Sequence, residues 1–168
     1  MDAADLLLEL YGRIPPLARA AVQGLDAQAL SRRPGPGANP VGWLVWHLAR
    51  VEDDHVAAAF EAEQVWSDPR WAPRFGLPAG STATGFAHSQ AEVDRVRPDD
   101  PATLLEYLDA VHEATGDRLR GVGPGDLDRV VDRRWDPPVT LGVRLVSVAD
   151  DCLQHAGQAA YVRGLLLG

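Results

Sequence analysis

Apolar residues recur every three and four positions along four long segments of this chain, and this spacing predicts helices. The segments cover roughly residues 3–24, 40–64, 101–121 and 140–166. Proline and glycine interrupt the pattern between them, most clearly in 33–40 and in 65–98. Four such helices with one long connection predict an all-α four-helix bundle, whose sites form from side chains on facing helices.

Prolines set several of the expected helix boundaries. Pro15-Pro16 must kink or split the first helix, because proline has no amide proton to donate. Asn39 is expected as the N-cap of the second helix, with Pro40 in its first position. Asp100-Pro101 opens the third helix, and a short extended piece is expected around 130–139.

Residues 65–98 form a long irregular loop between the second and third helices. A loop of this length in a compact domain more often has a function or packs on itself than serves only as a connection. Trp66, Trp71, Phe75 and Phe86 supply large apolar anchors within it. Two interpretations of Trp66 and Trp71 stay open at this point: they cap a cleft as a lid, or they pack the loop against the bundle.

Length and charge limit the kind of protein. With 168 residues, the chain is expected to form a single domain over 1–168. The net charge of −8 argues against general nucleic-acid binding, since there is no basic surplus to displace counterions. The N-terminus does not resemble a targeting segment, and the apolar runs are too short to span a membrane. We therefore expect a cytoplasmic protein that binds neither nucleic acid nor membrane.

The residue types also restrict the chemistry. The one cysteine, Cys152, allows neither an internal disulfide nor a cysteine-based zinc site. All sixteen basic residues are arginine, which excludes a lysine Schiff base. A metal site in this chain would therefore rely on histidine and carboxylate ligands.

Three residues could make such a site. Asp151 and His155 are four positions apart, so on one helix they lie about 40° apart around the axis and about 6 Å along it. Alone, this pair favours a solvated carboxylate beside a hydrogen-bonded histidine. His47 lies in one of the most apolar stretches of the chain and must find a partner there. If His47 faces the pair, the chain holds a two-histidine, one-carboxylate site.

Other residues compete for these roles. His55 is eight residues after His47, about 12 Å of helix rise, so the two cannot share one ion without strain. His112 adjoins the apolar face of the third helix and is a rival ligand, whereas His88 is expected at the surface. Cys152 could replace Asp151 as a ligand, but a lone buried cysteine is more often a small hydrophobe.

Three stretches resemble the DinB superfamily: Asn39–His55, Gln64–Pro78 and His155–Gly164. The similarity spans nearly the whole chain and is greatest to an actinobacterial branch related to mycothiol-dependent maleylpyruvate isomerase. It implies a bundle with up-down-down-up topology and a divalent metal on His47, Asp151 and His155. Family members often have histidine or glutamate at the position of Asp151, so this chain departs in ligand type.

The resemblance also implies a function. Three protein ligands leave a position for water or substrate, and zinc is the first expectation, with nickel, iron or manganese as alternatives. A thiol bound there would become a nucleophilic thiolate. The leading hypothesis is a thiol-dependent, mycothiol-like S-transferase or isomerase that acts on an electrophilic substrate. The alternatives are a metal-dependent hydrolase and a non-catalytic dimeric metal-binding bundle.

Further residues are candidates near such a site. Gln158 could donate a hydrogen bond to a ligand or be an ordinary polar residue at a helix interface. Arg50 and Arg163 could meet an anionic thiol or substrate, or form surface ion pairs. Asp54 could be the base of a hydrolase. A homodimer formed through helix faces is common among the proteins that this chain resembles.

Overall fold

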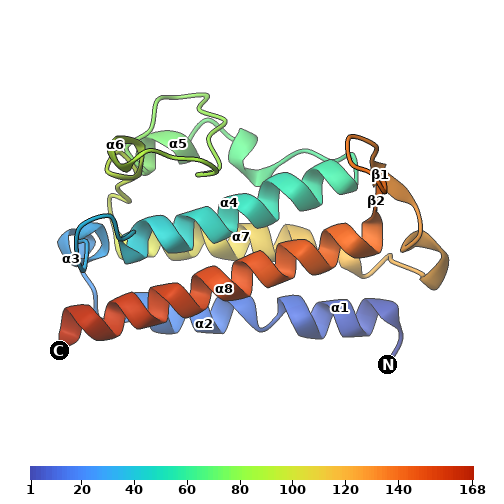
Figure 1. The fold of residues 1–168 in the computed structure, drawn as a ribbon, viewed down its shortest axis with the longest axis horizontal. Coiled ribbons are helices and arrows are strands. Elements are labelled where there is room, and N and C mark those ends of the chain that lie inside the picture. The colour runs from blue at the N-terminus through green and yellow to red at the C-terminus, as the bar shows by residue number, and fades with distance from the viewer.

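The computed structural model describes residues 1–168 and is mostly helical, with one small two-stranded sheet. Its main helices are α1 (Ala3–Tyr11), α2 (Ile14–Val22), α4 (Val41–Ala59), α7 (Pro101–Leu119) and α8 (Leu141–Leu167). In Figure 1, α1 and α2 follow one another along one side of α8, and α4 lies along the other. Helix α4 packs against both α7 and α8, and α2 packs against α8. The predominance of helix confirms the predicted helical character of the fold, and the two-stranded sheet is an addition to it.

Shorter elements connect the main helices. They are α3 (Ala27–Ser31), η1 (Val65–Ser67), α5 (Trp71–Arg74), α6 (Gln90–Val93), η2 (Pro124–Asp126), β1 (Val130–Asp132) and β2 (Val139–Thr140). Strands β1 and β2 pair antiparallel where a short extended piece was expected. None of the helices combines the length and the apolar character that crossing a membrane requires.

The helix ends follow local chemistry, with one difference from the expectation, at the start of α4. The first helix divides at Gly12 and Arg13, just before Pro15-Pro16, because proline is tolerated in the first turn of α2. Pro40 is the N-cap of α4 in place of Asn39, since its extended backbone lets its carbonyl accept the first helical hydrogen bond, from Leu44. Asp100 and Thr140 cap α7 and α8 with their side chains, as their positions suggest.

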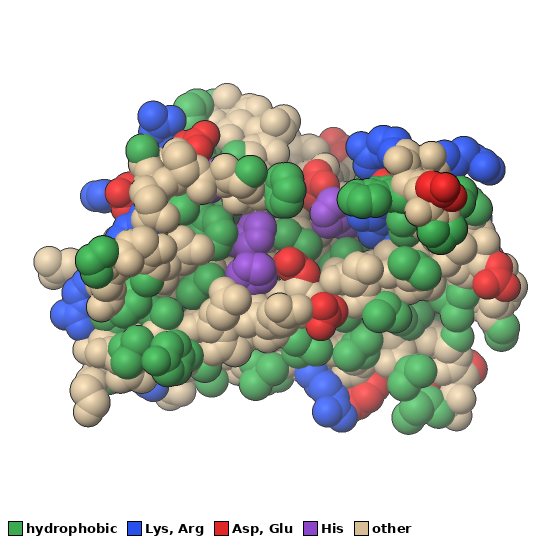
Figure 2. All heavy atoms as spheres, in the orientation of Figure 1, with side chains coloured by type: hydrophobic (Ala, Val, Ile, Leu, Met, Phe, Trp, Pro, Cys, Tyr) green, Lys and Arg blue, Asp and Glu red, His purple; other side chains and the backbone are tan.

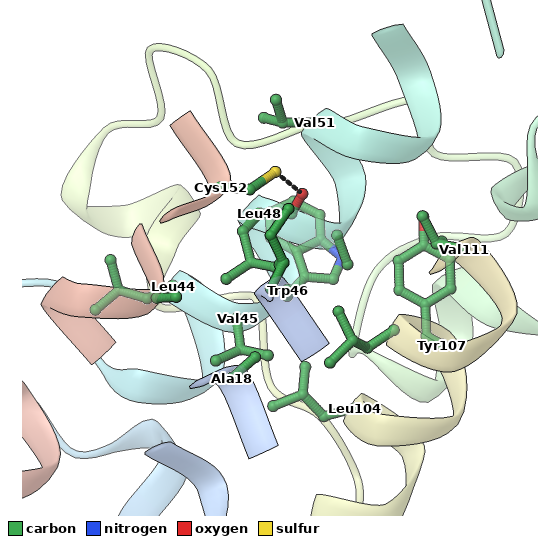
Figure 3. Close-up of a cluster of buried hydrophobic side chains, with 14 of the residues drawn as sticks. Ala18, Leu44, Val45, Trp46, Leu48, Val51, Leu104, Tyr107, Val111 and Cys152 are labelled. Carbon is green, nitrogen blue, oxygen red and sulfur yellow. Dashed lines mark hydrogen bonds between the residues drawn. The ribbon is translucent and has the colours of Figure 1, made fainter. Parts of the chain in front are cut away.

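A continuous apolar core fills the space between the helices. Figure 3 shows part of it, with Trp46 of α4, Tyr107 of α7 and Cys152 of α8 directed inward. Trp46 and Tyr107 are fully buried, and the thiol of Cys152 donates to the carbonyl oxygen of Leu48 at 3.3 Å. Aromatic side chains therefore bury much of the surface that stabilises the bundle.

A buried ion pair fastens the long segment after α4 to the bundle. Arg50, which is 1% exposed, donates to Asp53, Gln64 and the carbonyl oxygen of Ala83. Asp53 in turn accepts from the backbone N–H groups of Val65 and Trp66 at 2.8 Å each. Because these bonds reach both ends of residues 64–83, they hold this segment over the face of α4.

Candidate metal centre

His47 of α4 and Asp151 and His155 of α8 meet on one side of the bundle. One ligand atom from each lies within 4.8 Å of the other two. The imidazole rings of His47 and His155 are 4.6 Å apart between centroids and meet edge to face. The space-filling view in Figure 2 shows histidine and acidic side chains gathered in a hollow over these two helices. The structure thus brings together the three residues that the sequence singled out, and the condition that His47 faces the pair is met.

Backbone carbonyl groups orient both imidazoles. His47 donates its Nδ1–H to the carbonyl oxygen of Thr84 at 2.6 Å, and His155 donates its Nδ1–H to that of Asp151 at 2.9 Å. A carbonyl oxygen can only accept, so Nδ1 of each ring carries a proton, and in the neutral ring the Nε2 lone pair is free. As neutral rings, both histidines can therefore offer Nε2 to a metal ion.

The carboxylate of Asp151 supplies the third donor. Its Oδ2 is buried and has no hydrogen-bond donor, although it lies 3.3 Å from Nδ1 of His155. An orphaned buried carboxylate oxygen is costly unless a cation offsets its charge. Two free imidazole nitrogens beside one such oxygen form a donor set that fits a divalent cation.

Burial and mutual contact shift the pKa values of the three groups. Burial lowers the pKa of His47, which keeps the ring neutral. Burial opposes ionisation of Asp151, but the contacts with His155 and His47 outweigh it and hold the pKa of Asp151 below its usual value. The same contact with the carboxylate raises the pKa of His155. A cation would compete with the proton for His155 and would favour the ionised Asp151.

The loop residues Thr84, Gly85 and His88 complete the surroundings of His47. Gly85 has a φ of +97°, and a Cβ placed there would lie 2.5 Å from Nδ1 of His47. His88, expected at the surface, is half-buried, and its Nδ1 accepts from Nε1 of Trp43 at 3.3 Å. Sequence reasoning missed this support because residues 65–98 have no readable period. Gly85, between Thr84 and Phe86, was the only sequence feature that could have indicated this contact.

A cleft of about 710 Å³ opens beside His47 and Asp151, two of the three residues. His47 and Asp151 form one part of its wall, and His55 lies further along α4. The rest of the wall includes residues of the β1–β2 hairpin and of the start of α8. The volume is in the range of small-molecule sites, so an ion on the three residues would face a space that can admit a substrate.

The rival ligands lie elsewhere. His55 lines the cleft but is not among the residues whose ligand atoms meet, in accord with the helix-rise argument. His112 belongs to α7 and is outside the group. Cys152 points into the core, where burial raises the pKa of its thiol well above the ordinary value. A buried neutral thiol bonded to Leu48 is a packing residue.

Arg50 and Trp66 are both buried and do not line the cleft. Arg50 was considered for binding an anion, but it is buried and donates to Asp53, Tyr107, Gln64 and Ala83 instead. Trp66 is 5% exposed, so it packs the loop against the bundle and does not form a lid. Trp71 is buried in the same way.

The other polar candidates lie outside the cleft. Gln158 is exposed on α8. Arg163 donates to the carbonyl oxygen of Gln23 at 3.0 Å, which ties the end of α8 to the end of α2. Asp54 accepts from Gln64 and lies 3.5 Å from Nδ1 of His55, so it can act on the cleft only through that histidine.

Comparisons with known proteins show similarity in sequence and in fold. Residues 11–159 match the family described as the DinB superfamily. A conserved protein from Enterococcus faecalis has a solved structure that is similar at a TM-score of 0.91 and 30% identity, covering 100% of this chain and 99% of that chain. YfiT from Bacillus subtilis, described as a probable metal-dependent hydrolase with an unusual four-helix bundle topology, is similar at 0.57 and 16% identity, covering 96% and 85%. No curated protein sequence matches.

Proposed function

The chain belongs to the DinB superfamily, and from this premise we propose that it is a metal-dependent enzyme whose divalent ion is bound by His47, Asp151 and His155. The observation that carries the proposal is the buried Oδ2 of Asp151, which lacks a donor and lies beside two imidazoles with free Nε2 atoms. Three ligands of this kind leave a coordination position open. Zinc is the first choice, because it suits two imidazoles and one carboxylate; nickel, iron and manganese are the alternatives.

Hydrolysis is the reaction that the side chains of the cleft support best. A bound divalent ion supplies Lewis acidity, which lowers the pKa of water and polarises a carbonyl group. His55 lines the same cleft, where its ring could accept a proton from an attacking water. Asp54 lies 3.5 Å from Nδ1 of His55 and would stabilise the imidazolium that forms. The description of YfiT as a probable metal-dependent hydrolase agrees with this reaction.

A thiol-dependent transfer or isomerisation is the second candidate. The cleft of about 710 Å³ has room for a low-molecular-weight thiol such as mycothiol together with an electrophilic substrate. In this reaction the chain would orient the thiolate toward the substrate in place of water. The relation to mycothiol-dependent maleylpyruvate isomerase is part of this proposal.

Two structural proposals accompany the function. The long connection between α4 and α7 can span the length of the bundle, which supports an up-down-down-up order of the helices. The outer faces of α1 and α8 expose Leu6, Val146 and Tyr161, which supports a homodimer through helix faces. Sedimentation equilibrium tests the dimer. The single domain and the cytoplasmic location stay predictions.

The experiment that tests the proposed function begins with elemental analysis of protein purified without an affinity tag. We expect about one equivalent of a divalent metal in the wild type and a loss of that metal in His155→Ala. The loaded protein is then assayed with activated esters, and with an electrophile in the presence and absence of a thiol. Ester cleavage without thiol supports the hydrolase, and product that forms only with thiol supports the transferase. Metal-replete protein that binds no ion contradicts both.

A further inference from the structure

A pair of arginines lines the same cleft as His47 and Asp151 of the candidate metal centre. Arg144, at the start of α8, and Arg134, in the β1–β2 connection, both line it. Asp132 of β1 holds them together, since it accepts from Nη2 of Arg134 at 2.8 Å and from Nη2 of Arg144 at 2.9 Å. Asp132 therefore holds the two guanidinium groups together in the wall of the cleft, where Arg144 belongs to the same helix as Asp151.

Arg144 keeps unused hydrogen-bonding capacity. Its side chain is 18% exposed, and its only protein partner is Asp132, bound through Nη2. Its Nε and Nη1 have no protein acceptor, although the side chain lines the cleft. A guanidinium that is held in place on one edge and unpaired on the other is suited to bind a carboxylate or phosphate.

The charge of the cleft also favours an anion. Within its wall, Arg134 and Arg144 balance Asp132 and Asp151. A divalent ion on the candidate metal centre would add two positive charges. The cleft would then carry an excess of positive charge even though the whole chain has a net charge of −8.

Exposed aromatic side chains border the same cleft. Trp135 is 64% exposed and Phe86 is 86% exposed, and both line it. In Figure 2, hydrophobic side chains lie exposed around the hollow, next to basic ones. The other four tryptophans are buried, so an exposed tryptophan at this place is exceptional in the chain. An apolar ligand body could cover both rings.

We propose that this cleft binds a small molecule with an anionic group, such as a carboxylate, on an apolar body. The anionic group binds Arg144, with Arg134 beside it, and the apolar body lies against Trp135 and Phe86. The other end of the molecule points toward His47 and Asp151. This orientation rests on the proposed function, whereas the preference for an anion rests on the arginines alone.

The test compares two probes that differ only in charge, 3-phenylpropanoate and 3-phenylpropanamide. Trp135 is the one largely exposed tryptophan, so its fluorescence reports on binding in the cleft. Titrations are made with metal-free and with zinc-loaded full-length protein. We expect the carboxylate to bind about tenfold more tightly than the amide in both forms. Arg144→Gln should abolish this preference, and Arg144→Lys, which keeps the charge, should retain part of it.

Two controls separate binding from folding and from the metal. Arg120→Gln removes an exposed arginine that pairs with Asp117 outside the cleft, and it should keep the full preference. Thermal melting checks that Arg144→Gln is folded. If it is not folded, the carboxylate preference is tested with Arg134→Gln and Arg144→Lys instead.

The proposal would be overturned by a wild-type protein without a preference for the carboxylate, or by an undiminished preference in the folded Arg144→Gln protein. A preference confined to the zinc-loaded protein and insensitive to Arg144 would mean that the anion binds the ion, which also contradicts it. A protein that fails to bind zinc but keeps an Arg144-dependent preference would contradict only the proposed function.

Discussion

The Nδ1–H of His47 donates to the carbonyl oxygen of Thr84 at 2.6 Å, so a residue in the long loop orients a histidine on α4. This bond leaves Nε2 of His47 free and aims the ring at Asp151 and His155. Partners of this kind behind a ligand typically change metal affinity by about 10–100-fold when they are lost. The loop is therefore part of the candidate metal centre, although it provides no ligand.

Gly85→Ala should weaken metal binding by about tenfold or more. The new Cβ would lie 2.5 Å from Nδ1 of His47, and the φ of +97° disfavours any L side chain. The loop must shift, and the bond from His47 to Thr84 must lengthen. A competition titration with a zinc chelator measures the change.

Gly80→Ala is the matched control for this substitution. Gly80 has a φ of +77° in the same loop, but a Cβ there would meet no atom within 4 Å. We expect a similar loss of stability from backbone strain, about 1 kcal/mol, with unchanged zinc affinity. Equal zinc affinities in the two variants would show that contact with His47 does not matter.

Metal should stabilise the folded protein through Asp151 and His155. At a free concentration one hundred times the dissociation constant, a ligand adds about 2.7 kcal/mol, or roughly 5–10 °C in melting temperature for a chain of this size. Asp151→Asn and His155→Ala should each abolish most of this shift, while His112→Ala, on α7, should keep it. Differential scanning calorimetry with and without zinc measures the shifts. A His155→Ala protein that still melts higher with zinc would exclude this residue as a ligand.

Contacts within one helix were the part of the site that the sequence could predict. The positions of Asp151 and His155 follow from helix geometry alone, because four residues complete about one turn. Cys152 follows Asp151 directly, so it lies on a different side of the helix from Asp151 and His155. Its thiol is directed toward the carbonyl oxygen of Leu48. The meeting of His47 with this pair required knowledge of how α4 packs on α8, which the family resemblance implied.

Contacts made by irregular segments could not be predicted in this way. Thr84 acts through its backbone carbonyl, which every residue type possesses, so no side-chain pattern marks it. Arg50 was a candidate for binding an anion because the sequence does not show whether an arginine side chain is buried or exposed. Its partners include Gln64 and Ala83, which lie beyond the end of α4 and reach it only after the loop folds back.

Arg50 should stabilise the fold and take no part in catalysis. Arg50→Met would leave the buried Asp53 without its charged partner, at a cost of about 3–5 kcal/mol. Tyr107→Phe removes one donor to Asp53 and should cost about 1–2 kcal/mol. Arg50 and Arg70 each lie over a tryptophan ring, Trp66 and Trp71 respectively. Because Arg70 is exposed, Arg70→Met should cost less than about 1 kcal/mol. Urea denaturation measures the stability of all three variants. An Arg50→Met protein as stable as the wild type would contradict the stabilising role of Arg50.

Glu52 should make the folded protein less stable as the pH rises. Its carboxyl group is fully buried in α4, and neither oxygen has a hydrogen bond of normal geometry. Burial raises the pKa of Glu52 from 4.5 to about 7, although the nearby Thr115 hydroxyl favours the ionised form. Between these values the folded chain holds a proton that the unfolded chain has released. The contribution of Glu52 to the free energy of unfolding is therefore complete below about pH 4.5 and is lost as the pH rises to about 7.

The expected loss is up to about 3 kcal/mol, at about 1.4 kcal/mol for each pH unit of the window. Glu52→Gln keeps the shape of the side chain but cannot ionise, so the difference in stability between wild type and variant should shift in favour of the variant from pH 5 to pH 8. Glu113→Gln, an exposed change on α7, should show no such trend. Urea midpoints at a series of pH values measure both differences. A difference between wild type and Glu52→Gln that does not vary with pH would mean that Glu52 has the same pKa in the folded and unfolded chain, and that a contact favouring the ionised carboxyl group offsets its burial.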